Sequence, residues 1–114
     1  MVHGTFDVAN FGDLLFHHLL AFGLHPLPHR LTAVSPRGGR PTGWADTLDT
    51  LPTAQAQGLA AALHVVGGGN IILAADPALA EYAAIPGAYA GLWRGAAAQA
   101  ARNGAKLAWN APGV

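Results

Sequence analysis

The sequence predicts an α/β domain, a Rossmann-like, three-layer fold with a mainly parallel sheet of about four strands. Short apolar runs alternate along the chain with segments of helical periodicity, which is the pattern of successive βαβ units. Each expected strand is followed closely by glycine, proline or asparagine, residue types that mark the change from strand to loop. Because parallel strands are joined by right-handed crossovers, their carboxyl ends meet at one edge of the sheet.

The first expected strand covers residues 1–4, and a helix follows over residues 10–23. Asn10 can cap this helix, and Asp13 lies in its first turn, where the helix dipole favours a carboxylate. Gly23 is a stop signal. The residues that recur on one face with the helical period are Phe11, Leu14, Leu15, His18, Leu19 and Phe22.

The rest of the chain continues the alternation. Two prolines after the first helix mark a turn, and Gly104 ends the last helix. The later strands are expected at residues 30–34, 63–66 and 106–109, and the later helices at 53–62, 78–84 and 89–103.

Composition limits the classes of protein. The 114 residues suit one domain, and 52% hydrophobic with only 11% charged residues excludes a disordered chain. Six Lys+Arg against six Asp+Glu leave no basic excess for nucleic acid. With no cysteine and no signal peptide in the sequence, we expect a cytoplasmic location. The apolar stretch 59–75 is broken by glycines and His64, so no membrane span is expected. The scarcity of charge predicts marginal stability, self-association or a complementary domain.

Candidate binding residues follow the expected strands. Asn10, Gly12 and the helix-start amides can approach an anion, and Asp13 can accept a proton or bind a sugar hydroxyl. Helix capping alone also explains Asn10 and Asp13. The glycine motif Gly67-Gly68-Gly69 lets the backbone pass close to a substrate or to a neighbouring helix. Asn70 offers a donor and an acceptor to a hydroxyl group.

The sequence argues against two common kinds of bound group, a dinucleotide and a metal ion. The dinucleotide fingerprint G-x-G-x-x-G beginning at Gly67 requires glycine at position 72, where Ile72 stands, so no NAD or FAD is expected. The six histidines have no metal-ligand spacing, and no metal site is expected.

Two family resemblances start in the same segment. The run Gly4-Thr5-Phe6-Asp7 resembles the opening of the nucleotidyltransferase motif, but Asn10 and Asp13 occupy the positions of its two histidines. A second resemblance covers nearly the whole chain. The segments FDVANFGDLL (6–15), VVGGGN (65–70) and WNAPG (109–113) resemble, in this order, motifs of the polysaccharide pyruvyl transferase family.

This resemblance implies that residues 1–114 form the N-terminal half of a two-domain, GT-B-like enzyme of exopolysaccharide biosynthesis. Such an enzyme transfers pyruvyl from phosphoenolpyruvate to a sugar or glycan as a ketal, with no cofactor. We expect the donor-binding cations in the other half, and therefore no activity from the isolated chain. The resemblance implies a catalytic Asp13 and substrate-binding Asn10, Gly12, Gly67, Gly68, Gly69, Asn70 and Asn110. The alternatives are half of a nucleotide-sugar glycosyltransferase and a non-catalytic glycan-binding or partner-subunit domain.

Overall fold

A parallel five-stranded sheet forms the centre of the computed structural model, in the order β3-β2-β1-β4-β5. The structure describes residues 1–41, 43, 48–69, 71–73, 75 and 78–110. The register pairs Val2 with Ala33 on one side of β1 and with Val65 on the other. The strands are β1 (Val2–His3), β2 (Ala33–Ser35), β3 (Leu51–Pro52), β4 (Leu63–Val66) and β5 (Lys106–Trp109). The predicted α/β, Rossmann-like fold is confirmed.

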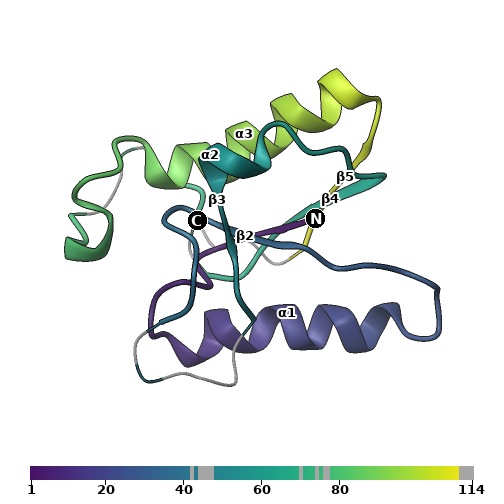
Figure 1. Cartoon of the computed structure of the whole chain (residues 1–114), viewed down its shortest axis with the longest axis horizontal. Coiled ribbons are helices and arrows are strands. Elements are labelled where there is room, and N and C mark those ends of the chain that lie inside the picture. The colour runs from purple at the N-terminus through teal and green to yellow at the C-terminus, as the bar shows by residue number, and fades with distance from the viewer. Residues whose placement is uncertain (42, 44–47, 70, 74, 76–77, 111–114) are drawn as a thin grey trace.

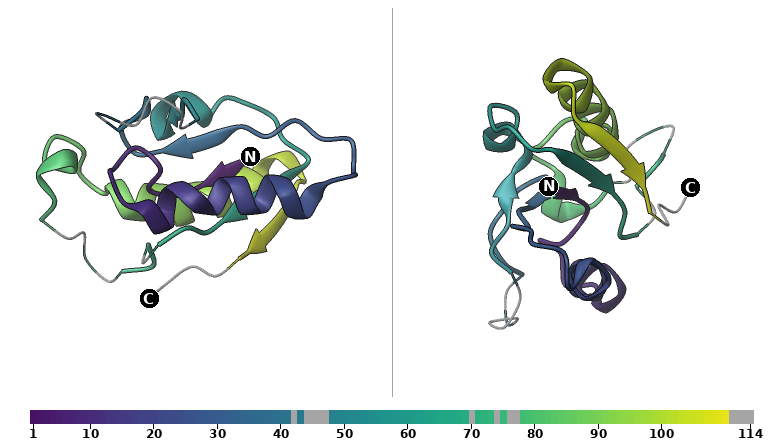
Figure 2. Two further views of the ribbon diagram at one scale, coloured as in Figure 1. Left: turned by 90° about the horizontal axis from the view of Figure 1, so that it is seen from below. Right: turned by 90° about the vertical axis from the view of Figure 1, so that its right-hand side faces the viewer.

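Helices cover both faces of the sheet. The helix α1 (Phe11–Leu24) lies on one face, and α2 (Thr53–Ala56) and α3 (Ala88–Asn103) lie on the other (Figures 1 and 2). A single 3-10 turn, η1 (Ala80–Tyr82), precedes α3. Apolar side chains of β1, β2 and β4 pack toward α1, and a larger cluster packs β4 against α3 and the segment before it.

The fifth strand was not predicted. β3 has two residues and ends on Pro52, and it forms one edge of the sheet. Proline has no N–H to donate, so it is tolerated at an edge and not in the middle of a sheet. A strand this short has no period that a sequence pattern could show.

The helix expected over residues 53–62 ends already at Ala56. The side-chain amide of Gln99 in α3 donates to the carbonyl oxygens of Ala56 and Leu59, each at 2.7 Å. These carbonyls would otherwise accept bonds within a longer helix. The contact with α3 therefore replaces the second half of the predicted helix. The remaining boundaries lie within three residues of those expected.

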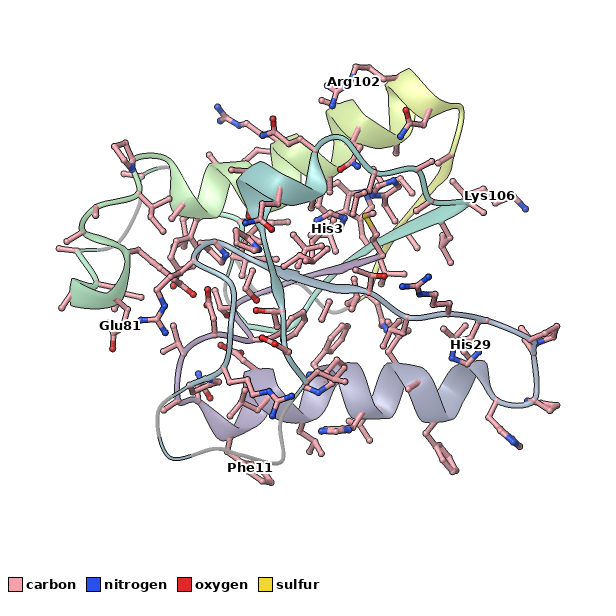
Figure 3. The ribbon with its side chains drawn as sticks, in the orientation of Figure 1. His3, Phe11, His29, Glu81, Arg102 and Lys106 are labelled. Atoms are coloured by element: carbon pink, nitrogen blue, oxygen red, sulfur yellow. The ribbon has the colours of Figure 1, made fainter. Side chains whose placement is uncertain are left out.

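The predicted position of α1 is confirmed, but the prediction of which face of the helix is buried is wrong. Phe11, Leu19 and Phe22 are 67%, 58% and 82% exposed, and Leu14 alone of the six predicted residues is buried. Figure 3 shows Phe11 directed away from the sheet. Asp13 and His17 face inward with Leu14 instead.

The loop after β1 sets this rotation of α1. The Thr5 hydroxyl donates to Asp13 Oδ2 at 2.6 Å. The Phe6 ring lies parallel to Phe16, with 6.2 Å between the ring centroids. These contacts turn Asp13 and Phe16 toward the sheet. The apolar residues that were predicted to be buried, Phe11, Leu19 and Phe22, therefore face solvent.

Candidate functional site

The candidate site lies at the carboxyl ends of β1 and β4. These strands are neighbours, yet the chain leaves β1 toward β2 on one side and returns to β4 on the other. This reversal of strand order is where ligands bind in open α/β sheets. The loop after β1, the start of α1 and the glycine motif after β4 meet at this position.

Asp13 is a titratable group at this point, in the first turn of α1. Its side chain is 8% exposed. Burial raises the pKa of the Asp13 carboxyl, and the hydrogen bond from Thr5 partly opposes this by favouring the carboxylate. A carboxyl whose pKa is raised by burial, next to a hydroxyl donor and a helix start, is suited to proton transfer.

The glycine motif packs against the protein itself. A Cβ on Gly69 would lie 2.5 Å from Asp13 Oδ1, and one on Gly68 would lie 2.8 Å from the Phe6 ring. A Cβ on Gly67 would overlap the Asn110 carbonyl oxygen. The three glycines thus let the loop after β4 approach α1 closely. Of the two roles that the sequence suggested for them, this is close packing against a neighbouring helix.

The remaining residues that were predicted to bind substrate do not all lie together. Asn10 caps α1, and its Oδ1 accepts from the Gly12 amide at 3.1 Å. Both residues are exposed beside Asp13. Asn110 is exposed, and its amide continues the pairing of β5 by donating to Val66 O at 2.9 Å. Asn70 lies outside the described residues.

Sequence reasoning missed the role of Asp7 at the same edge. Its buried carboxylate accepts from the backbone amides of Arg37 (2.7 Å) and Gly38 (3.0 Å) through Oδ2. Its Oδ1 accepts from the Tyr82 hydroxyl at 2.5 Å, and burial together with Asp7 raises the pKa of Tyr82. Arg37 also donates through Nη2 to the Asp7 carbonyl at 2.7 Å. The position of Asp7 shortly after a strand was the one local signal for this role, because its partner Tyr82 lies far away in the sequence.

The buried histidines contact other aromatic rings. His3 and His64 share one hydrogen bond between Nε2 and Nδ1 at 3.0 Å, and His17 contacts Phe6 edge-on. Figure 3 shows His3 in the interior beneath α3. Among the described residues, no group of three or more His, Cys, Asp or Glu side chains is placed to hold a metal ion.

In the described part of the chain, no helix combines the length and the hydropathy needed to cross a bilayer. No family model, curated protein or solved structure matches the chain.

Proposed function

We propose that the chain is the N-terminal part of a polysaccharide pyruvyl transferase that acts on a sugar or glycan. The observation that carries the proposal is the buried Asp13 carboxyl at the reversal point of the sheet, between the loop after β1 and the glycine motif. Two of the segments that resemble this family meet at that point, residues 6–15 and the described part, 65–69, of the glycine segment. Their proximity supports the proposal beyond their order in the sequence.

The proposed reaction needs a group that moves a proton. The CH2 carbon of phosphoenolpyruvate gains a proton and becomes a methyl group. Two sugar hydroxyls each form a C–O bond to the neighbouring carbon and lose their protons, one to the CH2 carbon and the other to the departing phosphate, as the bond from that carbon to the phosphate oxygen breaks. The products are the ketal and phosphate, with no net oxidation. Asp13 suits proton transfer or orientation of one hydroxyl because its carboxyl is buried, has a raised pKa and already accepts a hydrogen bond from a hydroxyl group.

The acceptor would lie beside the start of α1. Asn10 and Gly12 are exposed there, next to Asp13. In this proposal the cations that hold phosphate and carboxylate come from the second domain, as GT-B-like enzymes close two halves over a cleft. Coding DNA that continues in frame into strand-end loops with arginine and histidine would support this division.

Titration of the ¹⁵N-labelled chain with oligosaccharides tests the acceptor site, and incubation with phosphoenolpyruvate and oligosaccharides together tests for pyruvyl transfer. We expect oligosaccharides to shift the amides of Asn10, Gly12, Asp13 and Gly69. We expect the chain incubated with phosphoenolpyruvate and oligosaccharides together to release no phosphate above background. Asp13→Asn should abolish these shifts or weaken binding, whereas Asp49→Asn, an exposed control, should not. Shifts confined to other surfaces, or phosphate release by the chain alone, would contradict the proposal.

A partner-subunit domain is the second candidate, and the exposed row on α1 favours it. Phe11, Leu15, Leu19 and Phe22 present an uncharged apolar surface. Co-purification with a chain that carries the complementary half, without binding of oligosaccharide to the Asp13 region, would favour this function over the transferase.

A further inference from the structure

A pocket of about 610 Å³ lies at the amino ends of the strands, at the opposite edge of the sheet from Asp13. It is formed by the segment that leaves α1 for β2 and by the segment that leads into β4. In Figure 3 the labelled His29 marks this end of the molecule. The lining residues are Met1, Leu24, Leu27, Pro28, His29, Arg30, Leu31, Thr32, Leu59, Ala60, Ala61, Ala62, Leu63 and Val65.

The walls of this pocket are mostly aliphatic. Leu27 and Leu59 come from the two different segments, and they are 63% and 43% exposed. Covering such side chains with an aliphatic group gains roughly 25 cal/mol per Å² of apolar surface removed from water. The volume falls within the usual range of about 300–1,000 Å³ for small-molecule sites.

The charge of the lining is positive. Arg30 is its one charged side chain, and the lining contains no Asp or Glu. The amino terminus of Met1 donates to Leu63 O at 2.7 Å, and the His29 ring is bonded to Leu27 O at 2.8 Å. Among the described residues, none forms a hydrogen bond or ion pair with the Arg30 guanidinium. The guanidinium is therefore available to an anion, and its five N–H donors suit a carboxylate.

We propose that this pocket binds a small amphipathic carboxylate from solution, with the aliphatic tail against Leu27 and Leu59 and the head group on Arg30. The combination of aliphatic walls with one available cation and no acidic side chain selects this class of ligand. A sugar would leave the aliphatic walls uncovered. A cation would meet the guanidinium with no carboxylate nearby. The site is separate from Asp13, so it does not depend on the proposed transferase function.

Octanoate and 1-octanol are a matched pair of probes, because they share a tail and differ in charge. Titration of the ¹⁵N-labelled chain should shift amides in residues 27–32 and 59–63 with both probes. We expect octanoate to bind about tenfold more tightly than octanol, the effect of one hydrogen bond between charged groups. Arg30→Gln should remove this difference. Arg102→Gln, an exposed control at the end of α3, should leave it unchanged.

A second variant separates the tail from the head group. Leu59→Gln, at an exposed position, should weaken both probes by a similar factor. Equal affinity for octanoate and octanol, shifts outside the pocket, or no binding at millimolar concentrations would overturn the proposal. Binding of the chain to anionic phospholipid vesicles without a response to octanoate would also overturn it and would indicate a lipid surface instead. Asp13→Asn should not change octanoate binding, so this result is distinguishable from a failure of the transferase proposal.

Discussion

Mild acid should destabilise this protein, because three buried histidines are held neutral in the folded chain. Burial, aided by His64 and the amino terminus, lowers the pKa of His3 to about 3. Burial, aided by His18, lowers the pKa of His17 to about 4. The pKa of His64 is lowered by burial and by the amino terminus. In the unfolded chain these rings titrate near a pKa of 6.5, so unfolding takes up protons below that pH.

The sign and size follow from proton linkage. Above about pH 6.5 a histidine whose pKa is lowered by folding is neutral in both states, so its titration does not reduce the free energy of unfolding. As the pH falls from there toward the folded pKa, the unfolded chain binds a proton that the folded chain does not, and the free energy of unfolding decreases. From pH 7 to pH 5, the loss is about 2 kcal/mol for His3 and about as much for His17. Together these losses approach the total stability of a marginal domain, roughly 5 kcal/mol. The raised pKa of Asp13 acts in the opposite direction and offsets part of the loss.

Urea unfolding at pH 7 and pH 5, followed by tryptophan fluorescence, measures this loss. His17→Leu isolates one ring, because neither nitrogen of His17 has a hydrogen-bond partner among the described residues. We expect this variant to be more stable than wild type at pH 7 and to lose about 2 kcal/mol less on going to pH 5. His25→Gln, at an exposed histidine, serves as the control. The reasoning is refuted if the free energy of unfolding is the same at both pH values, or if His17→Leu loses as much as wild type.

Three further changes test other contacts. Gly69→Ala should destabilise by about 1 kcal/mol more than Gly39→Ala, because both have positive φ but only Gly69 meets another residue; equal losses in urea unfolding would show that the loop after β4 relaxes freely. Tyr82→Phe removes the hydroxyl from the buried Asp7 carboxylate and should cost about 1.5–3 kcal/mol in thermal or urea unfolding; an unchanged stability would argue against this bond. Phe22→Lys places a charge at an 82% exposed position and should reduce self-association in sedimentation velocity. Unchanged association would point to the β5 edge instead.

Local signals made much of the fold predictable. Gly104 takes a left-handed conformation (φ 62°) and ends α3 where the sequence indicated. Asn10 caps α1 as expected, and β4 and β5 occupy the predicted residues. Each of these features depends on residue types within a few positions, which a single sequence contains.

The features that sequence reasoning missed depend on contacts between distant segments. The length of α2 is set by Gln99, and the rotation of α1 is set by Thr5 and Phe6. Apolar residues surround most of α1, so periodicity alone could not select the buried face. At the candidate site, the position of Asp13 was predictable from its place in the first turn. The hydrogen bond from Tyr82 to Asp7 was not, because no local pattern links a 3-10 turn to a strand end.

The buried carboxylate of Asp7 has a mechanical consequence. It joins the loop after β1 to the loop after β2 and to η1 through Arg37, Gly38 and Tyr82. These three segments should therefore move as one rigid body. A ligand that reaches the carboxyl edge on this side therefore meets a surface that is already in place before binding, and any closure over the ligand has to come from segments outside this group.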